Sequence, residues 1–166
     1  AFYIAPGKTY LGGDFFYGEN SICLRETKDN EKDDLVKSDT IPEGFRKALL
    51  TYLVTAANML FKKETTSCSF LVHPGVKISE HEKVEEKAKK FLEGVKQDLA
   101  NAASTLEFDL KDCWEDLKKT KAGVADFNEI IKFLKTEMPN INIVTLNSKA
   151  LDGVSYDNGL NIIVGG

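Results

Sequence analysis

One histidine of this chain, His73, is predicted to lie at the edge of a sheet where α/β proteins bind their ligands. His73 directly follows the apolar run Ser69–Val72, which predicts a strand, and ligands bind beyond the carboxyl ends of strands in open α/β sheets. Alternatively, its imidazole hydrogen-bonds a neighbouring backbone group and fixes the turn before Pro74, since no Cys, His or carboxylate lies at metal-ligand spacing from it. The sequence leaves both interpretations open. The second histidine, His81, is expected to be solvated in the first turn of a charged helix.

The segment Pro6–Thr9 ends like a phosphate-binding P-loop, in which glycines expose backbone amides and a lysine meets the phosphates. That motif needs a glycine five positions before Gly7, and Phe2 stands there instead. Pro6 also removes a backbone donor from the loop. We therefore reject a P-loop in this segment.

Other catalytic arrangements find no support in the sequence. There is no G-x-S-x-G elbow, and Cys68, which lies near a histidine, is expected before a strand and not after it. A metal-dependent nuclease needs convergent carboxylates, and no strand-borne D…E-x-K arrangement occurs. The acidic residues considered for that role are Asp14, Glu19, Asp109, Asp112, Asp116 and Asp152. Lys149, at a strand exit, is expected to be a solvated loop residue, and we expect no metal site.

Composition indicates one globular domain. The 166 residues are 42% hydrophobic and 29% charged, which is ordinary for a chain with a genuine core. The formal net charge of −4 gives no obvious basic face, and glutamates interleave with the lysines of Lys83–Lys96, so this run predicts a solvated helix face. The cysteines, which are few and far apart, fit reduced thiols acting as small apolar fillers.

No apolar stretch has the length needed to cross a bilayer. A basic start followed by an apolar stretch and a cleavage site is also missing. We expect a cytoplasmic protein that does not bind membranes.

Along the chain, three stretches are expected within the single domain 1–166. Residues 1–41 are aromatic and glycine-rich and then charged; residues 42–138 are mostly helical, with a strand near 69–73; residues 139–166 hold two strands. In the first stretch, Ser21–Arg25 predicts a short strand. The charged run Lys28–Asp39 predicts an exposed, mobile loop.

Helical periodicity is clearest in two long segments. Pro42 opens a helix whose apolar residues share one face. Ser79 and Glu82 form an S-x-x-E capping box, which predicts the start of the second helix. The stripe residues are Phe45, Leu49, Leu53, Ala56 and Leu60 in the first helix and Val84, Ala88, Phe91, Val95, Leu99 and Ala102 in the second.

Two shorter helices follow, one around Leu110–Leu117 and one around Phe127–Leu134, and Met138–Asn140 ends the latter. The strands Ile141–Asn147 and Leu160–Val164 come last. Short apolar strands separated by helices predict an α/β fold with a mainly parallel sheet. The helical share is too large for a minimal doubly wound domain, so several helices are expected to elaborate one side.

Three segments together resemble the Z1 domain family: GKTYLGGDFFYGE at 7–19, SCSFLVHPGVKISEHEKV at 67–84, and INIVTLNSKALDGVSYDNGLNIIVGG at 141–166. The family has an early aromatic and glycine element, a strand that ends in histidine before a helix, and an asparagine–serine–lysine run after the next strand. The matching residues are Tyr10, Gly12, Gly13, Phe15, Phe16, His73, Asn147, Ser148 and Lys149. Val154 and Tyr156 loosely match an L-x-Y element, and Pro74–Gly75 departs from other members.

The family is associated with endonucleases and occurs in helicase-like proteins of prokaryotic restriction and phage-defence systems. The resemblance implies an incomplete RecA-like helicase lobe with a large helical insertion, from a parent that uses ATP and Mg²⁺ and acts on DNA. It implies that the nucleotide cleft or the DNA is faced by His73, Asn147, Ser148, Lys149, Gly165 and Gly166. In the family the final glycine pair continues into a helicase-like motif, and the P-loop lies upstream. We therefore expect a fragment without cofactor of its own that is inactive in isolation.

Two other functions stay open. The amphipathic helices over 42–61 and 79–103 motivate a non-catalytic scaffold that recruits partner subunits. A self-contained nuclease is motivated by the family's association alone, and Asp14 or Asp152 would have to carry it.

Overall fold

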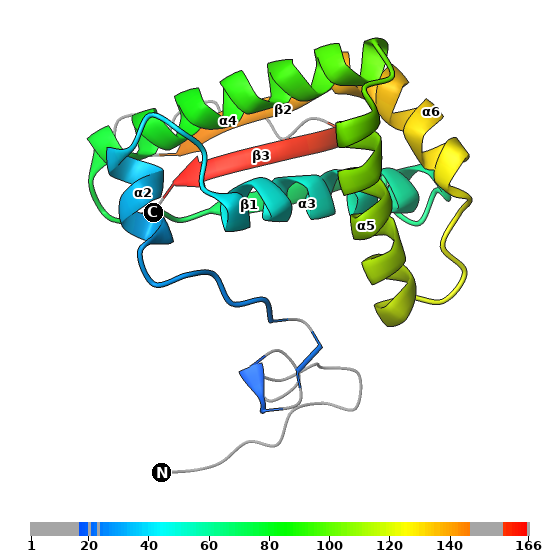
Figure 1. Cartoon of the computed structure of the whole chain (residues 1–166), viewed down its shortest axis with the longest axis horizontal. Coiled ribbons are helices and arrows are strands. Elements are labelled where there is room, and N and C mark those ends of the chain that lie inside the picture. Colours follow the sequence, from blue (N-terminus) through cyan, green and yellow to red (C-terminus); the bar gives the residue numbers. More distant parts are fainter. Residues whose placement is uncertain (1–16, 20, 23, 147–157, 166) are drawn as a thin grey trace.

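The computed structural model describes residues 17–19, 21–22, 24–146 and 158–165. These residues form an α/β fold with five α-helices, a short 3₁₀ helix and a three-stranded parallel sheet (Figure 1). The helices are α2 Glu31–Lys37, α3 Glu43–Phe61, α4 Ile78–Ala100, α5 Ser104–Thr120 and α6 Phe127–Glu137, followed by the 3₁₀ helix η1 Met138–Asn140. The strands are β1 Ser67–Val72, β2 Asn142–Leu146 and β3 Gly159–Gly165.

The sheet has the order β1-β3-β2, so the last strand of the chain lies in the middle. Val72 pairs with Val164 on one side of β3, and Leu146 pairs with Gly165 on the other. Both pairings are parallel, as the alternation of short apolar strands and helices predicts. Because the three strands run in the same direction, their carboxyl ends meet at one edge of the sheet.

Helices α3 and α4 cover the same face of the sheet. The ring of Tyr52 in α3 lies 5.3 Å from the ring of Phe70 in β1, and the hydroxyl of Thr145 in β2 donates to Glu85 in α4. Phe70 and Thr145 pair with β3 residues that are two apart in sequence, and such residues point to the same side of a strand. Figure 1 shows α3 running along β1 and α4 along β2. On the opposite face, Leu71 is 66% exposed.

The apolar stripes of the helices form one continuous core between this face and α5 and α6. Leu49 and Leu53 of α3 and Val84 of α4 have no exposed surface, and neither have Leu110 of α5 and Ile130 of α6. The predicted stripes are thereby confirmed except at the end of α4, where Ala102 lies beyond the helix and is exposed, and where Leu92 is buried while Phe91 is half-buried. Burying a side chain of this size stabilises the fold by about 1.5–3 kcal/mol.

Two predictions for the N-terminal stretch were wrong. Lys28–Asp39 contains α2, in which Leu35 is buried and the carboxylate of Glu31 accepts a hydrogen bond from the amide of Gly44 at 3.0 Å. Within the described part of Ser21–Arg25 there is no strand. A long-range partner for Glu31 and an apolar contact for Leu35 stabilise a helix that local charge density did not predict.

The predicted capping box at the start of α4 was also wrong. The helix begins at Ile78, its N-cap is Lys77, and no side chain caps it. Ser79 and Glu82 therefore lie inside the first turns, and the hydroxyl of Ser79 is not in the N-cap position that the motif requires.

A polar row crosses the sheet near the start of its strands. Asn161 of β3 is 1% exposed, and its amide donates to the hydroxyl of Ser67 at 3.1 Å and accepts from Asn142 at 3.3 Å. Its backbone carbonyl accepts a hydrogen bond of 2.9 Å from the hydroxyl of Tyr52. The buried side-chain amide is thus satisfied from both neighbouring strands, and the backbone carbonyl of the same residue is bound from α3.

Candidate functional site at the carboxyl edge of the sheet

The carboxyl edge of the sheet is organised around His73. This residue directly follows β1, and its Nδ1 lies 2.8 Å from the carbonyl oxygen of Gly165 at the end of β3. A carbonyl oxygen only accepts, so Nδ1 carries the hydrogen. In the neutral ring, Nε2 is then left as a hydrogen-bond acceptor on an exposed side chain. The expected backbone hydrogen bond is present, although its partner is 92 residues away in sequence and not a neighbour.

Gly165 fits a close approach between β3 and β2. A Cβ added there would lie 2.6 Å from the carbonyl oxygen of Leu146 and 2.9 Å from its Cβ. Any side chain at this position would push the two strand ends apart. Gly165 was expected at this edge from the family resemblance, and its packing gives a physical reason for glycine there.

The turn after His73 is held by the second histidine. His81 lies in α4, is 1% exposed, and its Nε2 is 2.7 Å from the carbonyl oxygen of Gly75. The prediction that His81 is solvated was therefore wrong. Glu82, which follows it in sequence, is exposed, whereas the helical period places His81 on the inner side with Val84 and Ala88.

A second polar contact near this edge was missed by sequence reasoning. Glu85 of α4 accepts from the hydroxyl of Thr145 near the end of β2 and pairs with Lys89 one turn further on. Burial raises the pKa of Glu85, but the hydrogen bonds from Lys89 and Thr145 outweigh it, so that the pKa lies below its usual value. The spacing of Glu85 and Lys89 was a signal for their ion pair, but nothing local indicated Thr145.

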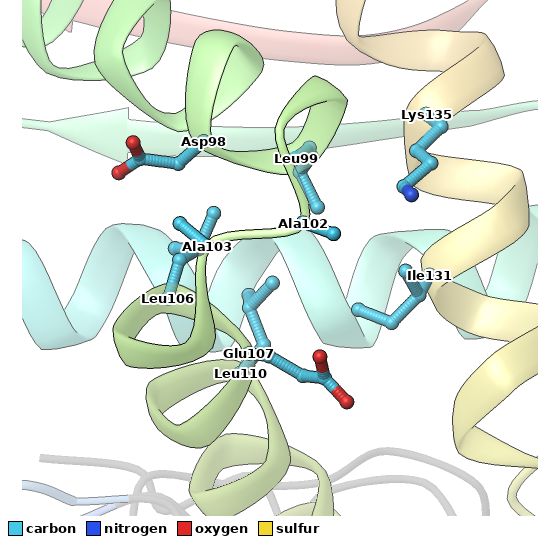
Figure 2. Close-up of a pocket in the computed structure, with 9 residues that line it drawn as sticks. All are labelled: Asp98, Leu99, Ala102, Ala103, Leu106, Glu107, Leu110, Ile131 and Lys135. Carbon is cyan, nitrogen blue, oxygen red and sulfur yellow. The ribbon is translucent and has the colours of Figure 1, made fainter.

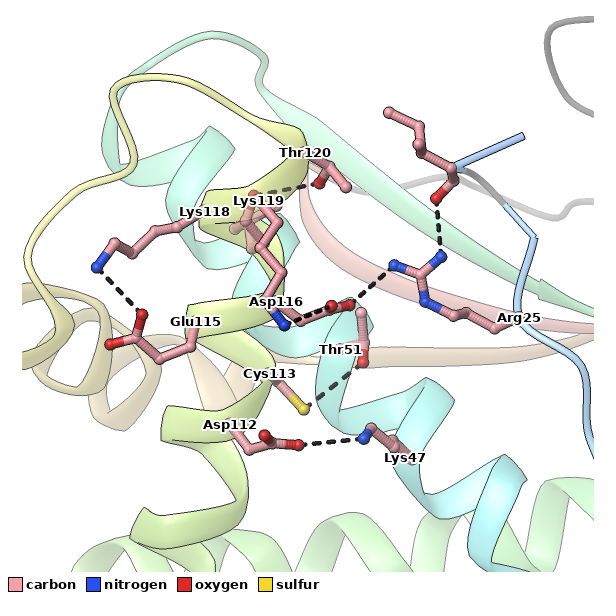
Figure 3. A network of polar contacts seen from close by, with 12 residues as sticks. Arg25, Lys47, Thr51, Asp112, Cys113, Glu115, Asp116, Lys118, Lys119 and Thr120 are labelled. Atoms are coloured by element: carbon pink, nitrogen blue, oxygen red, sulfur yellow. Dashed lines mark hydrogen bonds and ion pairs between the residues drawn. The ribbon is translucent and has the colours of Figure 1, made fainter. Parts of the chain in front are cut away.

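Three of the carboxylates considered for metal binding, Asp109, Asp112 and Asp116 of α5, are used in ion pairs. Asp112 pairs with Lys47 at 3.1 Å and Asp116 with Arg25 at 2.9 Å, as Figure 3 shows. Asp109 pairs with Arg46 in the same way. Along the described ranges, no group of three or more His, Cys, Asp and Glu side chains could hold a metal ion. These aspartates tie α5 to α3 and to the segment before α2.

Two cysteines lie inside the described part of the chain. Cys113 is buried, and its sulfur accepts from the hydroxyl of Thr51 at 3.5 Å (Figure 3). Cys68 lies within β1, not before it as predicted. Burial raises the pKa of both thiols, and the protonated thiol is a poor nucleophile. Both behave as the apolar fillers that their spacing predicts.

Two cavities lie away from the carboxyl edge. One of about 40 Å³ lies where the end of α4, the start of α5 and α6 meet, and Leu99, Leu106 and Ile131 line it (Figure 2). The other, of about 160 Å³, lies beside the ion pairs between α3 and α5. Ligand pockets usually enclose about 300–1,000 Å³, so neither has room for a nucleotide.

Several predicted site residues lie outside the described residues. They are Tyr10, Gly12, Gly13, Phe15, Phe16, Asn147, Ser148, Lys149 and Gly166. The same holds for Asp14 and Asp152 and for Val154 and Tyr156. Of the predicted site residues, the structure therefore brings together His73 and Gly165.

Among the described helices, none combines the length and the apolar character that a membrane span requires. The sequence model of the Z1 domain family matches residues 44–166. Comparisons with curated proteins and with solved structures gave no match.

Proposed function

Because the chain belongs to the Z1 domain family, we propose that it is part of a DNA-acting, ATP-dependent protein of a restriction or phage-defence system. The observation that carries the proposal is the joint carboxyl edge of the three parallel strands, where His73 is fixed to Gly165. In open α/β sheets this edge is where ligands such as nucleotides bind. The sheet would correspond to part of a RecA-like lobe, with α4 to α6 as its helical insertion.

In this proposal, His73 contributes Nε2, the ring nitrogen that is not bonded to Gly165, to the surface that meets DNA or nucleotide. Neither cavity described above has room for ATP, and Asp109, Asp112 and Asp116 of α5 are engaged in ion pairs. We therefore assign no step of ATP chemistry to the described residues. The parent protein would supply ATP and Mg²⁺ binding with other segments.

The scaffold alternative was motivated by the amphipathic helices. The apolar stripes of α3 and α4 are buried in the chain's own core, so these stripes need no partner to explain them. A nuclease remains the competing enzyme class, because the family name is associated with endonucleases. Cleavage of plasmid DNA with Mg²⁺ or Mn²⁺, lost on replacing Asp14 or Asp152, would favour it.

The test is ATP hydrolysis with and without DNA, measured in parallel for the 166-residue chain and for a longer natural protein that contains it. We expect DNA-stimulated hydrolysis in the longer protein, background in the chain alone, and reduced stimulation in His73→Ala. ATP hydrolysis by the chain alone would contradict the assignment of this chemistry to other segments. A longer protein without any DNA-stimulated hydrolysis would contradict the proposed function itself.

A further inference from the structure

We propose that His81 is a positioning residue, which holds the His73–Gly75 turn and thereby fixes the ring orientation of His73. The inference deepens the proposed function, on which it rests for the importance of His73. Three observations support it: how the turn is held, how His81 is buried, and how His73 depends on the turn.

Few other hydrogen bonds hold the turn in place. Outside the helices and strands, the backbone hydrogen bonds of the described residues include none from residues 73–76. Pro74 is buried and has no amide hydrogen, whereas Val76 is 85% exposed. Among the described residues, the hydrogen bond from His81 Nε2 to the carbonyl oxygen of Gly75 joins this turn to α4, beside the carboxylate of Glu80, which lies against Gly75.

His81 is an unusual choice for a purely structural contact. The carbonyl of Gly75 can only accept, so Nε2 carries the hydrogen, and the neutral ring leaves Nδ1 with a lone pair. That Nδ1 is buried, and among the described atoms it has no hydrogen-bond partner. A buried unpaired acceptor is destabilising. An apolar side chain would avoid this cost, but it could not donate the hydrogen bond to Gly75.

The position of His73 follows from that of the turn. His73 and Gly75 are separated by Pro74, whose ring restricts the backbone on both sides. The carbonyl of Gly75 is bound to α4, and at the other end of the turn Nδ1 of His73 lies 2.8 Å from the carbonyl oxygen of Gly165. We infer that the fixed turn sets the backbone of His73 and thereby favours this orientation of its ring. The two histidines thus connect α4 to the end of β3: His81 binds the turn, and His73, at the start of the turn, binds Gly165.

The test reads the ring nitrogens of both histidines by NMR with ¹⁵N-labelled protein near neutral pH. In the unmodified chain we expect His81 in the form with hydrogen on Nε2 and His73 in the form with hydrogen on Nδ1. His81→Leu removes the donor, and His73 should then lose its single form and show a mixture. His81→Gln keeps an amide donor near the place of Nε2 and should restore the His73 signals.

A matched control is Leu99→Ala, which weakens the packing of α4 near its other end and should leave the His73 signals unchanged. Folded His81→Leu protein with unmodified His73 signals would overturn the proposal. Hydrogen on Nδ1 alone of His81 in the unmodified chain would also overturn the proposal, because that form cannot donate to Gly75. Since these readings need no ATP or DNA, they stand whether or not the proposed function fails.

Discussion

The ring of His73 donates a hydrogen bond to the backbone of Gly165, and this contact joins the ends of β1 and β3. Both residues were singled out from the sequence for a functional role, and the structure shows that each also has a structural task. A substitution here therefore needs a control that keeps the donor while removing the ring.

His73→Ala should lower the free energy of unfolding by about 0.5–1.5 kcal/mol, the usual net worth of one hydrogen bond. His73→Asn, whose amide can donate from nearly the position of Nδ1, should lose less. Urea unfolding at neutral pH measures both. Equal losses in the two variants would show that the bond to Gly165 contributes little to stability.

Gly165→Ala should destabilise the chain by about 1–3 kcal/mol, because its Cβ would lie 2.6 Å from a backbone oxygen that cannot move without separating β2 and β3. The control is Gly94→Ala in α4, where an added Cβ meets nothing within 4 Å. There, alanine should stabilise the helix by about 0.5–1 kcal/mol. Opposite signs in thermal unfolding are expected, and a neutral Gly165→Ala would contradict the tight strand contact.

Tyr52→Phe should cost about 0.5–1.5 kcal/mol at neutral pH, since it removes the hydroxyl whose single hydrogen is shared between the carbonyls of Asn161 and Cys68. Exposed Phe108 offers a control, because Phe108→Ala should change stability by less than about 0.5 kcal/mol. Chemical unfolding of both variants at one pH makes the comparison.

The burial of Tyr52 also predicts how the stability of the chain changes at alkaline pH. Burial raises the pKa of its phenol far above the ordinary value of 10.0. Above pH 10.0 the unfolded chain releases this proton while the folded chain keeps it, so stability falls as the pH rises. The stability difference between the unmodified chain and Tyr52→Phe should therefore shrink from about pH 10 upward. A difference independent of pH would mean that Tyr52 is not buried as described.

The contribution of Glu85 to the stability of the chain should change with pH in the acid range. Its pKa lies below the ordinary 4.5, because the hydrogen bonds from Lys89 and Thr145 outweigh burial. The stabilisation from its charge is then present above pH 4.5 and is lost as the pH falls through the folded-state pKa. Glu85→Gln should be less stable than the unmodified chain near pH 7 and approach it below about pH 4. Glu82→Gln, at an exposed position of the same helix, should show no such convergence.

The helices and strands that the sequence predicted correctly are those whose signal lies within the segment itself. The stripes of α3 and α4, such as Leu49 with Leu53, and the apolar run of β3 define elements within their own segments, so periodicity found them. The parallel sheet followed from the order of those elements. By contrast, α2 depends on Glu31 meeting Gly44, and the burial of His81 depends on how α4 packs.

The candidate site was predictable to a smaller extent. Strand ends predicted that His73 lies at the carboxyl edge, which is confirmed, but its bond to Gly165 joins residues 92 positions apart. The same limit applies to Thr145, whose partner Glu85 lies 60 residues earlier. Contacts of this kind are set by tertiary packing and leave no periodic trace in the sequence.

The buried amide of Asn161 has a consequence for how the sheet assembles. Sliding β3 by one residue against its neighbours would turn Asn161 from the side of Ser67 and Asn142 into the apolar layer beneath α3. Such a slip exchanges every side chain between the two faces of the strand, and it would leave the amide without partners. Asn161 thus specifies the register of β3, because the shifted registers are much less favourable. In this register Gly165 lies where its carbonyl can accept the hydrogen bond from His73.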